Sequence, residues 1–380
     1  MPILDRRIPV STYRLQFNQA FTFKDATELI PYLHNLGITD CYASPYLKAL
    51  PGSTHGYDVI DPTTLNPELG EEHEYQQFVQ ALTEHGMGQI IDVVPNHMGI
   101  DRSANPWWQD VLENGPSSKH AKIFDIDWNP VKPELKNKVL LPILGEQYGI
   151  ALENQEIVLS FGDGQFFLQY YDHRLPIDPS TWPMILTCQQ EELTQKLNPE
   201  DPHLQEYQSI LTALSHLPSR NEEDPEQIAE RYREKDVIQR RLATLCQEHS
   251  NIAEFIIETV HRLNGVKGAH QSFDLLDSLV SEQAYRLAYW RVAVEEINYR
   301  RFFDINQLAA IRMEQADVFT EFHQCVFKLL QTGAVMGLRI DHIDGLYDPK
   351  GYLQQWQTWA SNELGLPVDA YNRSLFIIVE

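Results

Sequence analysis

The first hundred residues alternate between short apolar patterns of the strand type and longer amphipathic patterns of the helical type. The strand patterns occupy residues 8–17, 38–42 and 89–94, and the helical patterns occupy 25–35 and 71–85. A glycine follows closely after each helical pattern, as is typical of helix C-termini. Strands and helices that alternate in this way form parallel sheets with right-handed crossovers. The start of the chain therefore predicts an α/β fold.

The same alternation resumes near the C-terminus after a long interruption. Residues 99–316 do not follow it, and it returns with a helix at 317–330, a strand at 335–340, a helix at 352–364 and a strand at 374–379. The chain thus supplies five strands, whereas a (β/α)8 barrel requires eight. We expect a catalytic domain of the TIM-barrel type, truncated after the fifth strand, with a large and mainly helical insertion after the third strand.

The predicted domain organisation has three parts. Residues 1–98 form the first part of the barrel, residues 99–316 form the inserted subdomain, and residues 317–380 continue the barrel. Within the insertion, the acidic segment 198–233 is predicted to be a solvated helix–loop–helix. Residues 157–171 form an apolar stretch with turns.

Composition limits the classes of partner. Asp and Glu outnumber Lys and Arg by 54 to 30, giving a formal net charge of −24. Such a surface repels phosphate backbones and anionic lipids, so nucleic acid and membranes are poor partners and a neutral polar substrate fits better. The four cysteines share no CxxC spacing, which indicates reduced thiols rather than disulfides or a zinc site. We find no signal peptide and no apolar run near the ~18 residues of a membrane span, and we expect a soluble cytoplasmic protein whose protein partners the sequence leaves unknown.

Polar residues accompany each of the last three predicted strands at the end where a barrel builds its active site. Asp92 lies in the third strand, Arg339 and Asp341 in or directly after the fourth, and Glu380 directly after the fifth. A carboxylate in an apolar strand needs a partner, and Arg339 on the neighbouring strand is the natural one for Asp92. Arg339 and Asp341 are two residues apart and therefore point to the same side. We expect Arg339 to lower the pKa of Asp341 and so to keep this carboxylate ionised.

The remaining pair of carboxylates, Asp341 and Glu380, has the spacing of a retaining glycosidase. Adjacent strands are ~4.8 Å apart, and retaining glycosidases hold their two carboxyl groups ~5–5.5 Å apart. Asp341 would then act as nucleophile and Glu380 as general acid. Taken alone, the residues are also compatible with a structural ion pair at a strand end.

Other polar residues near these strand ends suit contacts with a sugar. An aromatic ring can stack on a sugar face, and His, Asn and Asp can hydrogen-bond hydroxyl groups. Each such residue alone is more often a loop or core residue than a ligand contact, and only their joint spacing points to a site. The residues that we expect to contact substrate, besides Asp92 and Arg339, are His55, Tyr57, Asp58, Asn96, His97 and His342.

Several stretches resemble the signature regions of the α-amylase superfamily, glycoside hydrolase family 13. They are Asp92-Val93-Val94-Pro95-Asn96-His97, residues 337–341, the strand that ends in Glu380, and Phe302-Phe303-Asp304-Ile305-Asn306, which is similar to the signature near the end of domain B. Within the superfamily, the motifs STYRLQ (11–16), STHGYDV (53–59), NYRRFFD (298–304) and GLRIDHIDGL (337–346) are similar to those of the maltooligosyltrehalose synthase family. The resemblance runs from the start of the chain to its last residue, although residues 198–233 add little.

This resemblance implies a (β/α)8 barrel with a helical insertion and a retaining, intramolecular transglycosylation. The α-1,4 bond to the reducing-end glucose of a maltooligosaccharide becomes an α,α-1,1 bond, in a reaction that needs no metal and no cofactor. By position, Asp341 matches the nucleophile and Glu380 the general acid/base. The residues that match those lining the site around the sugar at the cleavage point are Asp92, Asn96, His97 and Arg339.

The sequence departs from the superfamily pattern in two places, and two alternatives follow. Typical amylases have Lys-His three and four positions after the nucleophile, where this chain has Asp344-Gly345, a change that favours the synthase over a plain hydrolase. The superfamily's third carboxylate follows a later strand than this chain contains. One alternative is a hydrolase of α-glucans or of maltooligosyltrehalose, and the other is a non-catalytic glucan-binding fragment.

Overall fold

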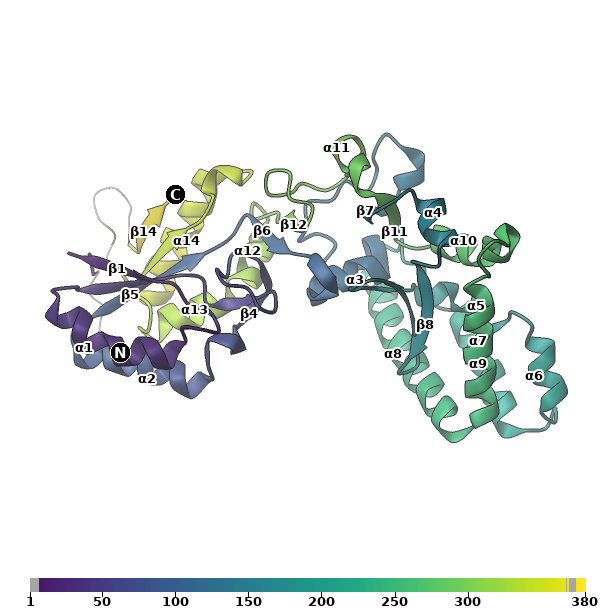
Figure 1. The fold of residues 1–380 in the computed structure, drawn as a ribbon. Coiled ribbons are helices and arrows are strands. Elements are labelled where there is room, and N and C mark those ends of the chain that lie inside the picture. The colour runs from purple at the N-terminus through teal and green to yellow at the C-terminus, as the bar shows by residue number, and fades with distance from the viewer. Residues whose placement is uncertain (1–6, 367, 369–373) are drawn as a thin grey trace. The chain divides into compact units, whose positions relative to one another are not determined.

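The computed structural model describes residues 7–366, 368 and 374–380 of the chain (Figure 1). By its contacts the chain divides into two compact units. Unit 1 comprises Met1–Asn105, Lys122–Asp125 and Arg300–Glu380, and unit 2 comprises Pro106–Ala121 and Ile126–Tyr299. The predicted domain limits at residues 98 and 316 stay a prediction.

Unit 1 is organised around a five-stranded sheet with the strand order β1-β2-β5-β13-β14. Every neighbouring pair in this sheet is parallel, and the strand order follows the chain order. All five strands predicted from the sequence are confirmed, with bounds that lie within or close to the predicted ranges. The strands are β1 (Thr12–Leu15), β2 (Asp40–Ala43), β5 (Gly88–Val93), β13 (Gly337–Ile340) and β14 (Phe376–Val379).

The central strands of this sheet are buried, as their apolar sequences require. Every residue of β5 is buried, which is the pattern of a parallel strand covered on both faces. β13 begins at Gly337, where a Cβ atom would lie only 3.0 Å from the Phe376 carbonyl oxygen of β14. The glycine thus permits the close approach of the fourth and fifth strands.

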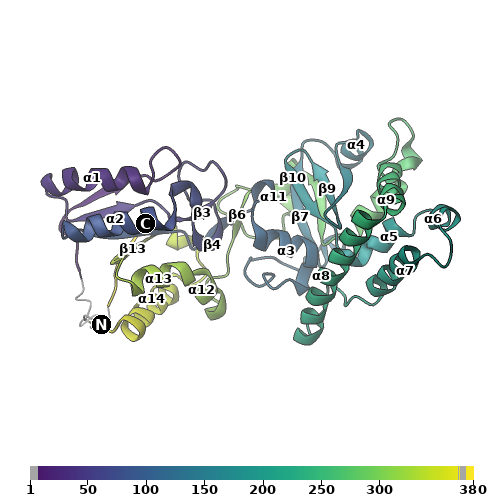
Figure 2. The ribbon, with the colours of Figure 1, turned by 90° about the horizontal axis from the view of Figure 1, so that it is seen from below.

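Two helices of unit 1 pack side by side after the first two strands (Figure 2). They are α1 (Phe23–Asn35) and α2 (Glu72–Glu84), close to the predicted ranges. The buried residues of α1 recur every three or four positions, so one face of the helix is covered. Thr22 and Asp25 form a capping box at its start, which satisfies backbone N–H groups that a helix leaves free.

The helix predicted at 317–330 is two helices in the structure. α12 (Ala316–Phe322) and α13 (Gln324–Gln331) are separated at His323, which is fully buried. The Nδ1 atom of His323 bonds the Phe319 carbonyl at 2.7 Å, and its Nε2 atom lies 3.0 Å from the Tyr352 hydroxyl of α14 (Pro349–Leu364). The buried histidine therefore links α12 to the last helix, a tertiary contact that helical periodicity does not reveal.

Two short antiparallel pairs carry the loops near the carboxyl ends of the sheet. β3 (Leu47–Ala49) pairs with β4 (Val59–Leu65), and the loop 53–58 joins them. β6 (His97–Gly99) pairs with β12 (Leu308–Ala310), so that His97 lies opposite Ala310. These pairs fix the segments that follow β2 and β5.

Unit 2 contains two sheets in addition to its helices. β7 (Val139–Leu144) pairs in parallel with β11 (Tyr285–Tyr289). The apolar stretch with turns at 157–171 forms most of a three-stranded antiparallel sheet, in which each chain reversal is a short turn. Its strands are β8 (Val158–Gly162), β9 (Gln165–Tyr170) and β10 (His173–Pro176).

Three helices of unit 2 contact one another in turn, since α7 (Pro202–Ser215) contacts α8 (Pro225–Glu248) and α8 contacts α9 (Ser250–Leu263) (Figure 2). The acidic segment 198–233 forms helix–loop–helix structure, as predicted. An Asp-Pro pair starts both α7 and α8, where Asp201 and Asp224 cap the helix and proline occupies the first turn. Among the helices described here, none is long and apolar enough to cross a membrane. The described helices of unit 2 are α3 (Pro106–Asn114), α4 (Tyr148–Glu153), α5 (Trp182–Leu186), α6 (Gln190–Lys196), α7 (Pro202–Ser215), α8 (Pro225–Glu248), α9 (Ser250–Leu263), α10 (Asp274–Ser281) and α11 (Ala293–Glu296).

Candidate active site

Arg339 joins three carboxylates at the carboxyl ends of three neighbouring strands. It lies opposite Asp92 in the register of β13 and β5, and its Nη1 atom donates to both oxygens of Asp92, at 2.7 and 2.9 Å. The same nitrogen donates to Asp341 at 2.7 Å, while Nη2 donates to Glu380. The predicted pairing of Arg339 with Asp92 and the expected proximity of Arg339 to Asp341 are confirmed, whereas the bond from this guanidinium to Glu380 was not predicted.

Asp92 is the most enclosed of the three carboxylates, since its side chain has no exposed surface. One of its oxygens accepts hydrogen bonds from the Tyr57 hydroxyl at 2.6 Å and from the Tyr42 hydroxyl at 2.9 Å. Burial raises the pKa of Asp92, while the hydrogen bonds from Tyr57 and Arg339 act in the opposite direction. A buried carboxylate with this many donors is held in one orientation.

The pKa of Asp341 is raised, whereas the sequence predicted a lowered pKa. Burial and a hydrogen bond to Glu380 raise the pKa of Asp341 to about 7, and these effects outweigh the opposing attraction of Arg339. The expectation that Arg339 leaves Asp341 with a lowered pKa is therefore wrong. The two carboxylates also differ in access, because the Asp341 side chain is 11% exposed and that of Glu380 62%.

Asn96 and His97 are fixed behind these carboxylates by hydrogen bonds. His97 Nε2 lies 3.1 Å from the Tyr57 carbonyl oxygen, and His97 Nδ1 lies 3.4 Å from the Asn96 amide nitrogen. Burial lowers the pKa of His97 to about 4, so the ring is neutral near pH 7, with its N–H directed at Tyr57. The Asn96 oxygen accepts from Arg300 at 2.9 Å.

Gly345 gives a steric reason for the departure from the amylase pattern. A Cβ atom at this position would lie 2.5 Å from the His342 ring and 2.6 Å from the Asn96 side-chain oxygen. His342 itself adopts a left-handed conformation with φ 49° and ψ 49°, and its ring packs edge-on against Phe302 at 4.7 Å between centroids. A side chain at 345 would therefore displace predicted site residues.

The loop 53–58 brings only one of its three predicted site residues to the carboxylates. Tyr57 reaches Asp92 through its hydroxyl, and the His55 ring stacks on the Tyr57 ring at 6.0 Å between centroids. Asp58 accepts from the Ser53 hydroxyl at 2.6 Å and lies 4.0 Å from His55. In this structure His55 and Asp58 thus support the Tyr57 loop.

Four further residues belong to this site that sequence reasoning did not select. Arg14 donates to the Tyr57 hydroxyl at 2.9 Å, and Tyr42 donates to Asp92. Arg300 holds Asn96 and the Gly345 carbonyl, and Phe302 packs between the rings of His97 and His342. The available signal was the position of Arg14 and Tyr42 near the ends of the first two strands.

The side chains of this site include carboxylates, phenols, a guanidinium and imidazoles. Among the described residues, the group whose side chains could share a metal ion is Asp201, His203 and His249 of unit 2.

Part of the chain is similar to α-amylases. Residues 20–154 match the family model described as the α-amylase catalytic domain. The intracellular maltogenic amylase of Bacillus subtilis (strain 168) is 36% identical over 102 residues, which is 27% of this chain and 16% of that protein. Together with the parallel sheet, these matches show an α/β fold of the TIM-barrel type.

A narrower relationship covers nearly the whole chain. A Mycobacterium tuberculosis (strain H37Rv) protein, provisionally named a maltooligosyl trehalose synthase, is 33% identical over 353 residues, or 91% of this chain and 32% of that protein. The structure of maltooligosyltrehalose synthase from Arthrobacter ramosus is 30% identical with a TM-score of 0.63, covering 98% of this chain and 34% of that one. The chain therefore resembles the maltooligosyltrehalose synthases of the α-amylase superfamily, and it spans about a third of the length of these relatives.

Proposed function

We propose that the chain carries the nucleophile and the general acid/base of an intramolecular transglycosylase. The reaction converts the reducing-end α-1,4 bond of a maltooligosaccharide into an α,α-1,1 bond, as a (1→4)-α-D-glucan 1-α-D-glucosylmutase does, and so contributes to trehalose biosynthesis. The observation that carries the proposal is the bridge from Arg339 to Asp92, Asp341 and Glu380 at adjacent strand ends. The similarity to maltooligosyltrehalose synthases supports it.

In the proposed mechanism, Asp341 attacks the anomeric carbon of the penultimate glucose unit while Glu380 protonates the departing oxygen. The glycosidic bond breaks, and a covalent glycosyl-enzyme and a free glucose result. Glu380 then accepts the proton of the anomeric hydroxyl of this glucose as that hydroxyl attacks the same carbon and releases Asp341. The product is an isomer of the substrate, and these two reaction steps need no metal or cofactor.

The positions of the two carboxylates support these roles. Asp341 is largely enclosed and oriented by Arg339, as a nucleophile that must point in one direction should be. Glu380 follows the adjacent strand β14 and bonds the same guanidinium as Asp341. Asp341 must be ionised to attack while Glu380 must carry a proton, so the raised pKa of Asp341 limits the proposed rate on the acid side of about pH 7.

The substrate contacts are proposed for the residues around these carboxylates. The ring of Tyr57 offers a face for a sugar, and Arg339 offers a polar group that is already fixed in orientation. Asp92, whose side chain has no exposed surface, serves by holding Arg339 and Tyr57 in place. Isomerisation competes with hydrolysis, so the released glucose must stay while water is excluded. The remaining proposed contacts are His55, Asp58, Asn96, His97 and His342.

We also propose that the sheet of unit 1 is the first part of a (β/α)8 barrel. Successive strands are neighbours in the order β1-β2-β5-β13-β14, as in a barrel, and unit 2 enters the chain between the third and fourth of them. The coverage of about a third of the relatives is compatible with this assignment. For the location we propose the cytoplasm, because all four cysteines are free thiols.

The nucleophile assignment is tested by comparing the protein with its Asp341→Asn variant on maltopentaose. We expect the protein to remove reducing ends and the variant to lose this activity by at least about 1,000-fold, since the covalent step is missing. A glutamine at Glu380 should slow the reaction as well, with less effect on activated substrates that need no acid. An Asp341→Asn variant that retains the rate of the protein overturns the assignment.

A further inference from the structure

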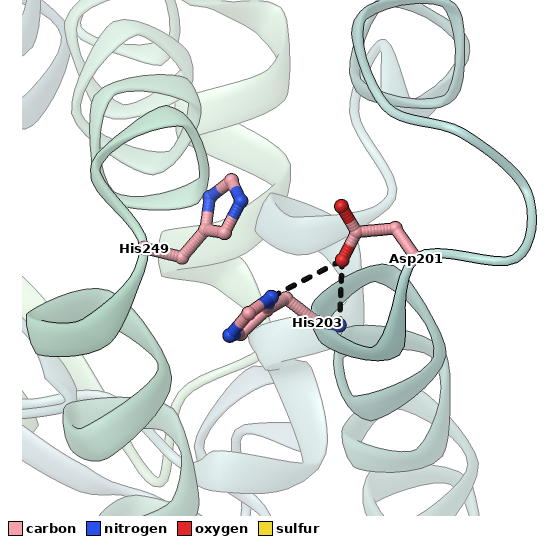
Figure 3. A group of neighbouring side chains, drawn as sticks. All are labelled: Asp201, His203 and His249. Atoms are coloured by element: carbon pink, nitrogen blue, oxygen red, sulfur yellow. Dashed lines mark hydrogen bonds and ion pairs between the residues drawn. The ribbon is translucent and has the colours of Figure 1, made fainter.

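Asp201, His203 and His249 bring three metal-ligating side chains together in unit 2 (Figure 3). Asp201 caps the start of α7, and His203 lies in the first turn of that helix. His249 lies at the junction between the end of α8 and the start of α9. Two of the three ligands are thus fixed to one helix end, and the third is held between two other helices.

The spacing of these side chains is close to that of a zinc site. One ligand atom from each residue lies within 4.8 Å of the others. The Asp201 oxygen and His203 Nδ1 are 3.1 Å apart, and the two imidazole rings are 4.6 Å apart between centroids. Ligands in a tetrahedral zinc site lie about 3.4 Å apart, given Zn–N and Zn–O bonds of about 2.1 Å. The ligand atoms, which lie within 4.8 Å of one another, would move closer together when an ion binds.

One ligand atom of this cluster has no hydrogen-bond partner among the described residues. His249 Nδ1 is buried and has no hydrogen-bond partner within the described part of the chain. A buried polar atom without a partner is costly, and a bound cation would satisfy it.

The cluster also borders an open groove between α7 and α8. This groove has a volume of about 490 Å³, and His203 and Glu206 of α7 form part of its wall. Glu248, the residue before His249, lines it from α8. An ion held by three protein ligands would therefore have space for water or a carboxylate at its fourth position.

We propose that Asp201, His203 and His249 form a binding site for a divalent cation of the zinc class, which ties α7 to the junction of α8 and α9. The sequence predicted no metal ligands, because these residues are separated by up to 48 positions and match no zinc spacing. The proposal is independent of the transglycosylase function and concerns the structure of unit 2.

The test uses tag-free protein that has been stripped with EDTA, titrated with ZnCl2 by calorimetry. We expect one Zn²⁺ per chain and a rise in the melting temperature on binding, because the ion binds the folded state. His203→Ala and His249→Ala should each weaken binding at least about tenfold, and Asp201→Asn should weaken binding while keeping an oxygen that can cap α7. His261→Ala is the matched control, since His261 is an exposed histidine of α9 outside the cluster.

Cobalt supplies a second measurement that needs no variant. Co²⁺ in the site of the unmodified protein should show the intense visible absorption of tetrahedral coordination, and Zn²⁺ should displace it. Absence of binding, a weak octahedral cobalt spectrum, or zinc affinity that is the same in His203→Ala, His249→Ala and His261→Ala would each overturn the proposal.

Discussion

Arg339 and Asp92 are register partners on adjacent strands, and one guanidinium nitrogen of Arg339 lies within 2.9 Å of both Asp92 oxygens. This nitrogen also bonds Asp341, and the other terminal nitrogen bonds Glu380. The two proposed catalytic carboxylates are thus oriented by the same cation that neutralises a buried carboxylate behind them. Orientation and charge at the site both depend on Arg339.

Replacing Arg339 with methionine should therefore destabilise unit 1 strongly. The variant leaves Asp92 buried without its cation, a situation that costs about 3–5 kcal/mol in free energy of unfolding. Arg312→Met is the control, because the Arg312 side chain is 40% exposed and pairs with nearby Glu314. Urea unfolding checks both variants. Equal, small losses of stability for the two would contradict the central role of Arg339.

Substitutions at Tyr57 should separate its hydroxyl from its ring. Tyr57→Phe loses the bond to Asp92 and should lower the free energy of unfolding by about 1–2 kcal/mol, because a buried acceptor loses a donor. The variant keeps the ring and should still bind maltopentaose, whereas Tyr57→Ala should not. Tyr32→Phe is a control at an exposed position of α1. Equal maltopentaose affinity for the Phe and Ala variants would exclude stacking on Tyr57.

The raised pKa of Asp341 predicts a pH-dependent stability. The folded pKa of about 7 lies above the unfolded value of about 4, so the folded state is penalised progressively as the pH rises from about 4 to 7. Asp341→Asn removes this penalty. We expect the variant to match the protein in melting temperature at pH 4 and to exceed it by about 2–4 °C at pH 8. A variant that is less stable than the protein at pH 8 would show that Arg339 dominates and that the pKa is lowered.

Gly345 should not tolerate a methyl group. Gly345→Ala places a Cβ atom within 2.6 Å of His342 and Asn96, and overpacking of this kind costs about 1–3 kcal/mol. Gly149→Ala is a suitable control, because no atom lies within 4 Å of its Cβ position in α4 and alanine favours helix. Thermal melts of the two variants should shift in opposite directions. A neutral Gly345→Ala would refute the steric explanation for the glycine.

The strands and the Asp92–Arg339 pair could be predicted from the sequence because both follow from local rules. A charge inside an apolar strand requires a partner on a neighbouring strand, and parallel strand order narrows the choice to few residues. The break at His323 and the sheet at 157–171 depend on tertiary contacts that periodicity does not encode. The same holds for the hydroxyl of Tyr42 and for Arg300, whose bonds reach across many residues.

The raised pKa of Asp341 could not be predicted from the sequence. Spacing along one strand indicates a favourable charge at Arg339, but it gives neither the burial of Asp341 nor its hydrogen bond to Glu380. The cluster of Asp201, His203 and His249 likewise exists only because α7 contacts α8 and α8 contacts α9. A pKa that depends on burial and a cluster that depends on helix packing can be found only in the three-dimensional structure.

The most direct test of the proposed function is the balance of products from maltopentaose. Reducing ends and free glucose are measured in parallel as the protein acts. We expect reducing ends to disappear with little glucose released and trehalose ends to appear in equal amount, since each turnover is an isomerisation. Glucose release with a matching increase in reducing ends would identify a hydrolase, and binding of maltopentaose without turnover would identify a glucan-binding protein. Either result would contradict the account.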